Sequence, residues 1–155
     1  MPIEEENLKA EYVKAEKTAL KLVARAEQCS GLLSRKLQQK QYSPAVIEAV
    51  IARLAGQDLI NDRRYAELWL KSKIAKGNKG PLVLKMKLLE RGIDKETAEA
   101  ALEAALTPET EAALLERCLE KLFLKSDLKN SDMRYMLKMQ GFSADAINQY
   151  FEAIS

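Results

Sequence analysis

The sequence predicts an all-α protein, arranged as a tandem array of three three-helix repeats with about nine helices. The first observation is compositional: strong helix formers dominate the chain of 155 residues, which has only six Gly and four Pro. The second is an internal repeat, because residues 37–43, 88–94 and 137–143 each carry a leucine, a turn residue, an apolar residue and a helix-starting residue. Each unit of such an array buries its apolar face against its neighbours, so we expect an elongated molecule.

The first repeat is placed at residues 1–60. Apolar residues at helical spacing predict a first helix over residues 3–29, and Ser30 is expected to cap a second helix. The third helix is predicted to start at Ser43 and Pro44. A serine oxygen can accept a hydrogen bond from an unpaired helical N–H, and proline lacks the N–H that would have no partner there.

The second repeat is placed at residues 61–106. Asn61 or Asp62 is expected to cap its first helix, because both side chains can accept a hydrogen bond from the first helical turn. The segment 76–81 contains two glycines and a proline, so we expect it to break this helix and to start the next one. Asp94 is then the predicted N-cap of the third helix, whose inward positions are mostly alanines.

The third repeat is placed at residues 107–155. Thr107 and Pro108 repeat the combination of a capping residue and a proline, and an apolar stripe follows over residues 114–123. We expect a polar loop at residues 126–131. The last two helices then meet at a glycine and a serine within residues 141–143. Apolar positions align across the three repeats, and we expect them to be buried: Leu33, Leu84 and Met133; Leu37, Leu88 and Leu137.

The charges of the chain are unevenly distributed, although its net charge is only +2. Residues 63–91 hold nine basic and two acidic side chains, whereas residues 94–120 hold two basic and eight acidic ones. A basic segment of this kind can orient a protein on a polyanion, while a solvated helical face is the simpler interpretation. The candidate partner-binding side chains are Arg63, Arg64, Lys71, Lys73, Lys76, Lys79, Lys85 and Lys87.

The residue types argue against an enzyme. The sequence has no histidine, which excludes His-dependent nucleophiles and His metal sites. It also has no Walker-type loop, so a nucleotide-binding site of that type is not indicated. The segment 77–80 is weak as a phosphate cradle and is better interpreted as a turn that exposes lysines. Cys29 and Cys118 are too few and too distant for a zinc site, and we expect two buried thiols. No cofactor or metal is predicted.

The location prediction rests on hydropathy and on the first residues. No apolar run approaches the ~20 residues of a membrane span. Glu4, Glu5 and Glu6 are the opposite of the basic start of a signal peptide. We therefore expect a cytoplasmic protein without membrane contact, and a monomer.

Three stretches resemble the RecX family, the regulatory proteins that modulate the RecA recombinase. Residues 25–37 are similar to the family's entry to its second helix. The segment 76–81, followed by Leu88 and by residues 91–93, is similar to its Gly-x-x-Gly-Pro…Leu…(Lys/Arg)-Gly-(Ile/Val) block. The most specific likeness is to the signature Gly-Leu-(Leu/Ile)-Asp-Asp-x-Arg-(Phe/Tyr)-Ala, which in this chain reads Asp58-Leu59-Ile60-Asn61-Asp62-Arg63-Arg64-Tyr65-Ala66.

The resemblance implies a non-enzymatic regulator that binds the RecA–DNA filament and inhibits recombinase activity. It also implies a curved array of three-helix repeats that lies along the filament. Weak binding of single- or double-stranded DNA is a further expectation. Two residues depart from the pattern, since Asp58 stands for a glycine and Asn61 for an aspartate. Asn61 can still cap a helix.

Two alternatives stay open. The short turns between paired helices are also typical of helix-turn-helix modules, which would bind duplex DNA in the absence of RecA. A helical scaffold for another protein partner is the second alternative.

Overall fold

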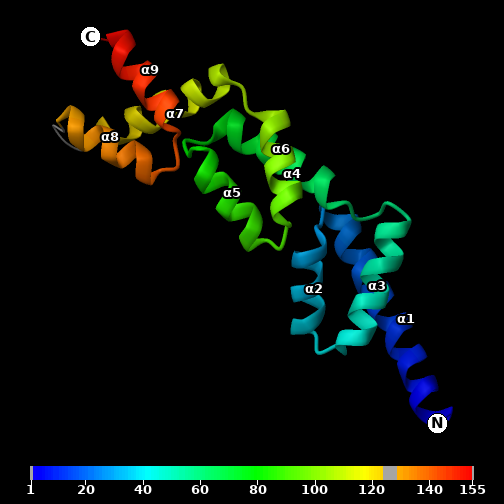
Figure 1. Ribbon diagram of the computed structural model, residues 1–155. Coiled ribbons are helices and arrows are strands. Elements are labelled where there is room, and N and C mark those ends of the chain that lie inside the picture. Colours follow the sequence, from blue (N-terminus) through cyan, green and yellow to red (C-terminus); the bar gives the residue numbers. More distant parts are fainter. Residues whose placement is uncertain (1, 124–128, 155) are drawn as a thin grey trace. The chain divides into compact units, whose positions relative to one another are not determined.

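The computed structural model describes residues 2–123 and 129–154, and these ranges contain nine helices and no strand (Figure 1). The prediction of an all-α fold with three helices in each repeat is confirmed. Part of the predicted polar loop at 126–131 lies outside the described residues. The helices are α1 Pro2–Arg25, α2 Ser30–Gln39, α3 Pro44–Gly56, α4 Asp62–Lys76, α5 Pro81–Glu90, α6 Lys95–Ala105, α7 Pro108–Phe123, α8 Asn130–Met139 and α9 Ala144–Ile154.

The aligned apolar positions are buried in all three repeats. Each pair lies on the second helix of its repeat, one turn apart, and faces the helices that pack against it. Their exposed fractions are Leu33 0%, Leu84 1% and Met133 6%, and 0% for Leu37, Leu88 and Leu137. Equivalent positions of the three sequences therefore have the same place in the fold.

The turn after each second helix also repeats. Its left-handed residue is Gln41 (φ 68°) in the first repeat, Gly92 (φ 85°) in the second and Gly141 (φ 93°) in the third. Glycine adopts this conformation without steric cost, whereas Gln41 places a side chain there. The three turns thus share a left-handed backbone at this position, although the residue there is not the same in all three.

One predicted N-cap, Ser30, is wrong, and another, Ser43, is correct in position but lacks the predicted side-chain hydrogen bond. The first helix ends at Arg25, and Cys29, not Ser30, is the N-cap residue of α2. Ser43 has the expected extended backbone before Pro44, yet its side chain accepts no hydrogen bond from the helix. In both cases an acidic side chain from another helix binds the helix start, which a local sequence pattern cannot indicate.

In the first and third repeats, the start of the third helix is bound by an acidic residue at an equivalent position of the first helix. The Ser43 N–H donates to Glu11 Oε1 (2.5 Å), so α1 holds the start of α3. In the third repeat, Glu111 Oε1 accepts from the N–H (2.9 Å) and the hydroxyl (2.8 Å) of Ser143, so α7 holds the start of α9. A carboxylate at a helix N-terminus satisfies an unpaired donor and interacts favourably with the helix dipole.

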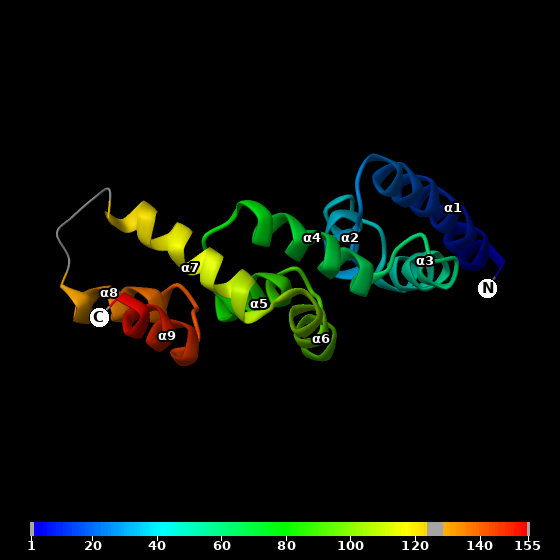
Figure 2. The same ribbon diagram turned by 90° about the horizontal axis from the view of Figure 1, so that it is seen from above.

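The chain forms two compact units. The first is Met1–Tyr65 with Arg91–Ile93, and the second is Ala66–Glu90 with Asp94–Ser155. In the first unit, α1, α2 and α3 pack around one core, as both ribbon views show (Figures 1 and 2). Its centre contains Ala15 and Ala19 of α1, and the small alanine side chains let α1 approach α3 closely.

In the second unit α5 packs on α6, and α7 packs on α8 and α9 (Figure 2). The start of α5 is fastened to the turn after α8, because the Gly80 N–H donates to Gln140 O (2.8 Å) and the Leu82 N–H donates to Gly141 O (3.0 Å). Gly80 leaves no room for a Cβ atom, since the backbone of Gly141 and Phe142 lies against it. This contact fixes the position of the loop that carries Lys79.

Candidate partner-binding residues

The turn between α3 and α4 carries the most specific signature, and two polar side chains stabilise it. Asp58 has a left-handed backbone (φ 58°), which Asp and Asn tolerate better than most residues. The Asn61 amide donates to Asp58 Oδ1 (3.0 Å), and Asn61 Oδ1 accepts from the Arg64 N–H (2.9 Å). Asn61 is therefore the side-chain cap of α4, as predicted, and both departures from the RecX pattern preserve the turn.

Asp62 acts on a different helix from the one it begins. Its Oδ1 accepts from the Ser30 N–H (2.7 Å), and its Oδ2 accepts from the Ser30 hydroxyl (2.6 Å). The carboxylate thus binds the N-terminus of α2. This explains why the signature has two polar residues in succession: Asn61 caps α4, and Asp62 ties α4 to α2.

Arg64 is engaged inside the first unit. Its Nε donates to Glu27 Oε1 (2.6 Å), and its Nη1 donates to Asp58 Oδ2 (3.2 Å). The bond to Glu27 raises the pKa of Arg64, and the Asn61 amide together with the Arg64 guanidinium lowers the pKa of Asp58. Arg63, its neighbour, is exposed. The signature is therefore mainly structural, and Arg63 is its exposed cation.

Helix α4 carries three exposed lysines, Lys71, Lys73 and Lys76. Each residue advances a helix by about 100°, so Lys71 and Lys73 project from opposite sides, whereas Lys73 and Lys76 share a face. Lys73 Nζ lies 5.5 Å from the centroid of the Trp69 ring, within the range of a cation–π contact. Lys73 and Lys76 are thus the basic pair that α4 presents together.

The loop between α4 and α5 uses several of its donors within the second unit. The Gly77 N–H bonds to Lys73 O (2.6 Å), and the Gly80 N–H bonds to Gln140 O. The Lys79 ammonium donates to the side-chain oxygen of Gln140. These donors are not directed at an anion, so the geometry favours the structural turn over a phosphate cradle.

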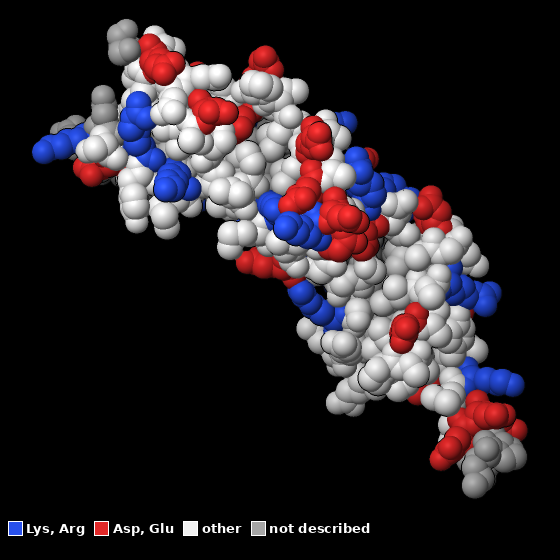
Figure 3. Space-filling view, in the orientation of Figure 1, with Lys and Arg blue, Asp and Glu red and all other residues white. Residues whose placement is uncertain are grey.

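The two lysines of α5 also differ. Lys85 Nζ lies 2.6 Å from Glu99 Oε1, and this contact lowers the pKa of Glu99. Lys87 projects from the opposite side of the helix. Figure 3 shows acidic side chains gathered over α6, with basic side chains among them. Lys85 is therefore paired with an acid, and both α5 lysines are partly buried, so the exposed basic residues of α4 are the stronger candidates.

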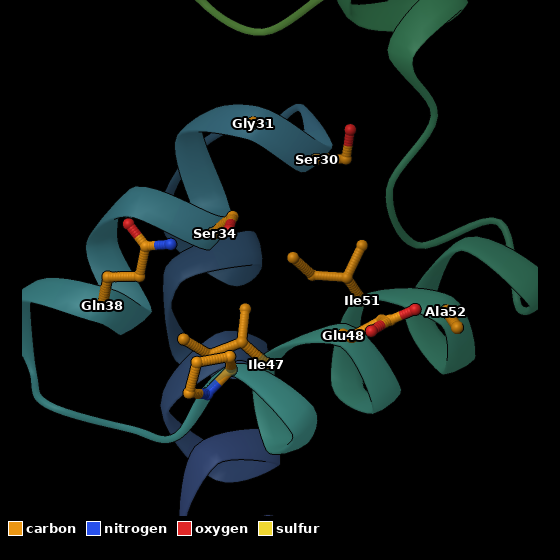
Figure 4. A pocket seen from close by; sticks show the side chains of 9 residues that line it. Ser30, Gly31, Ser34, Gln38, Ile47, Glu48, Ile51 and Ala52 are labelled. Atoms are coloured by element: carbon orange, nitrogen blue, oxygen red, sulfur yellow. The ribbon is translucent and has the colours of Figure 1, made fainter.

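Sequence reasoning missed a groove between α2 and α3 of the first unit (Figure 4). It has a volume of ≈ 450 Å³. Ser34 and Gln38 of α2 line it together with Ile47, Glu48 and Ile51 of α3, so an acidic group stands beside an apolar wall. The signal that could have found it is the repeat alignment, since the residue equivalent to Ser34 is a long cation in each of the other repeats.

The described residues contain no group of three or more His, Cys, Asp or Glu side chains placed to hold a metal ion. Across 2–123 and 129–154, no helix is long and apolar enough to cross a membrane. Cys29 and Cys118 are buried free thiols, as expected, and burial raises the pKa of both.

Two family models match the chain. The first three-helix domain of RecX matches residues 15–54, and the second three-helix domain of RecX matches residues 61–102. The first match covers α2 completely, most of α3, and residues 15–25 of α1. The second covers α4 and α5 completely and most of α6, so it includes all eight candidate basic residues.

Relatives and solved structures agree with these matches. The regulatory protein RecX of Thermobifida fusca is 28% identical over 86% of this chain and 74% of its own length. That of Halalkalibacterium halodurans is 31% identical over 74% of this chain, but the aligned part spans only 45% of the relative. A crystal structure of RecX from Lactobacillus salivarius is 26% identical with a TM-score of 0.81, covering 94% of this chain and 97% of that one. With both of its first two repeats matched by the family's own domains, this chain belongs to the RecX family of regulatory proteins.

Proposed function

We propose that this chain binds the filament that RecA forms on DNA and restrains recombinase activity, without catalysing a reaction itself. The observation that carries the proposal is its membership of the RecX family, whose curated members are named regulatory proteins. A cytoplasmic, monomeric protein is part of the same proposal. The division into repeats at 1–60, 61–106 and 107–155 gives it three similar units with which to contact a repeating partner.

The proposed contact surface contains the basic side chains of the middle repeat. Arg63, Lys71, Lys73 and Lys76 are exposed along α4, and they lie within the matched second domain. The other four cations, Arg64, Lys79, Lys85 and Lys87, are partly buried, and three of them have partners in the chain. The exposed cations of α4 are accessible to a nucleoprotein filament and can attract it from a distance.

The charges on the third helices weigh against independent recognition of duplex DNA. A helix-turn-helix module inserts its second helix into the major groove, which here would be the third helix of a repeat. The net charge of that helix is zero in α3, which has one Glu and one Arg. It is negative in α6, with three Glu and one Lys, and in α9, with two acids and no base. Negative helices are repelled by the DNA backbone, so a protein filament is the better partner.

Co-sedimentation with RecA filaments on single-stranded DNA tests the proposal, with naked DNA as the parallel sample. The wild-type chain should sediment with the filament and much less with DNA alone. Replacing Lys71, Lys73 and Lys76 by Glu should weaken filament binding about tenfold and make it less sensitive to salt. The matched control replaces three exposed lysines of α1, Lys14, Lys17 and Lys21, by Glu and changes the net charge equally.

Two results would contradict parts of this proposal. Sedimentation with neither filament nor DNA would reject filament binding altogether. Equal binding by the α4 variant and the α1 control, with unchanged helical circular dichroism, would reject the α4 lysines as the contact surface.

A further inference from the structure

A cation on the second helix bridges to the third helix in two of the three repeats. In the middle repeat, Lys85 of α5 contacts Glu99 of α6 at 2.6 Å. In the third repeat, Arg134 of α8 donates from Nη1 to Asn148 Oδ1 of α9 at 2.9 Å. Both pairs are fourteen residues apart, and both begin one residue after the aligned buried position, Leu84 or Met133. The bridge is therefore a repeated feature of the fold.

The third repeat shows the whole environment of this cation. The Arg134 guanidinium carbon lies 4.5 Å from the centroid of the Phe151 ring, while its Nη1 reaches Asn148. An apolar residue of α9 thus supports the flat side of the guanidinium, and a polar residue one turn earlier accepts its hydrogen bond. This is a favourable setting for arginine, whose planar head combines stacking with directed donors.

In the first repeat the equivalent cation is missing while its surroundings are present. Counting from Leu33 in the same way, Ser34 stands at the cation position, Glu48 at the acceptor position and Ile51 at the apolar position. All three line the groove of ≈ 450 Å³ between α2 and α3, as Figure 4 shows. Within the part of the chain that the structure describes, Glu48 makes no ion pair. The groove is therefore the space that a long cationic side chain fills in the other repeats.

We propose that this groove binds an arginine side chain of a protein partner. The aliphatic stem would lie along Ile47 and Ile51, and the guanidinium would reach the Glu48 carboxylate where Arg134 reaches Asn148. Ser34 and Gln38 add a hydroxyl and an amide oxygen from the opposite wall. Three acceptors around one apolar channel suit the several donors of arginine better than the single ammonium of lysine.

The charge of the groove also selects the class of partner. Glu48 repels phosphate, so a nucleic-acid backbone does not fit, whereas a basic residue of a protein gains an ion pair shielded on one side by isoleucine. That the partner is a subunit of the RecA filament rests on the proposed function. The preference for an arginine side chain rests on the repeat comparison alone.

The first arm of the test needs no partner protein. Nα-acetyl-arginine amide is titrated into the ¹⁵N-labelled full chain, with the uncharged isostere Nα-acetyl-citrulline amide as the matched probe. The arginine probe should give saturable amide shifts confined to α2 and α3, with Kd on the order of 1 mM. The citrulline probe should give at least about fivefold weaker binding, because it lacks the charge.

Two variants tie the shifts to the groove. Glu48→Gln removes the carboxylate charge, and Ser34→Arg supplies the missing internal cation, so both should weaken binding of the arginine probe at least about fivefold. Glu103→Gln, an exposed acid on α6, is the control and should bind as the wild type does. Equal binding of both probes, no saturable shift, or unchanged binding by Glu48→Gln would overturn the proposal.

The second arm applies the same variants to filament co-sedimentation. If the wild type binds filaments, Ser34→Arg and Glu48→Gln should lower the bound fraction while Glu103→Gln does not. Unchanged filament binding by both groove variants would reject the groove as part of the filament contact and leave filament binding itself standing. Absence of filament binding by the wild type would instead reject the proposed function, and the arginine titration would decide the groove on its own.

Discussion

An acidic residue stands at an equivalent position on the first helix of every repeat, but it binds a different helix in the middle repeat than in the outer two. In the outer repeats Glu11 and Glu111, on the first helix, bind the start of the third helix of the same repeat. Their counterpart in the middle repeat is Asp62, which binds Ser30 at the start of α2, in the preceding repeat. The same acidic position thus closes a repeat in two cases and joins two repeats in the third.

The residue at the start of the third helix explains the difference. It is a serine in the outer repeats and Asp94 in the middle one, and Asp94 caps its own helix by accepting from the Thr97 N–H (2.7 Å). That contact lowers the pKa of Asp94, so the group is ionised at neutral pH. A second carboxylate beside it would be repelled. Asp94 makes a contact from Asp62 unnecessary, and Asp62 is available to join α4 to α2.

The largest predicted effects concern what the repeats share. Leu37→Ala, Leu88→Ala and Leu137→Ala should each lower the free energy of unfolding by about 2–5 kcal/mol, because each removes a side chain with no exposed surface and leaves a cavity. Urea denaturation followed by circular dichroism measures the losses. A loss near zero in one repeat would show that this repeat does not share the packing of the other two.

The sequence predicted the shared features well and the exchanged contacts poorly. Leu33 and Leu37 were assigned to the core because a helical period of apolar residues is a local pattern, and burial follows from it directly. The same reason predicts Asn61 or Asp62 as a cap, since a cap acts within three residues of its own position, and Asn61 is the residue that caps α4. Such features depend on neighbours that are close in the chain.

The contacts that were missed join residues far apart in the chain, from 14 positions for Lys85 and Glu99 to 61 positions for Lys79 and Gln140. The sequence predicts that the side chains of Ser30 and Ser43 accept hydrogen bonds from their own helices, but Asp62 and Glu11 bind those helix starts from 32 residues away. Likewise a count of lysines predicted one basic face, but it could not indicate that Lys85 pairs with Glu99. The sequence shows where each charged residue stands in the chain, but only the fold shows which charged side chains form ion pairs with each other.

Replacing Asp62 and Glu111 by alanine, one at a time, tests whether each acidic residue stabilises a different helix start. Asp62→Ala should cost about 1–3 kcal/mol, because the Ser30 N–H and hydroxyl lose their acceptor. Hydrogen exchange should accelerate at the start of α2. Glu111→Ala should cost less, about 0.5–1 kcal/mol, because water can replace the carboxylate at the exposed Ser143, and it should accelerate exchange at the start of α9 instead. Faster exchange at α6 in the Asp62 variant would contradict the assignment, because it would mean that Asp62 supports its own repeat.

The smallest predicted effect tests the cation bridge of the middle repeat. Lys85 lowers the pKa of Glu99 below its ordinary value, so the folded state favours the ionised carboxylate more than the unfolded chain does. The stabilisation of the folded state by the Lys85–Glu99 pair is therefore fully present above the unfolded pKa of Glu99, about 4.3. It is lost as the pH falls through the lower pKa of Glu99 in the folded state. Glu99→Gln should lower Tm by no more than about 2 °C at pH 7 and low salt, because the pair is exposed and screened.

This difference in Tm between wild type and Glu99→Gln should shrink as the pH falls below the unfolded pKa of about 4.3 towards the lower folded pKa, because Glu99 becomes protonated over that range. Thermal scans of the two proteins at each pH measure it, and Glu103→Gln, which lies one turn further along α6, is the reference for a carboxylate without this bridge. A difference that stays constant down to pH 3 would show that the Lys85–Glu99 contact does not depend on charge. In that case the groove of the first repeat would lose its analogy with the middle repeat and would rest on the bridge between Arg134 and Asn148 alone.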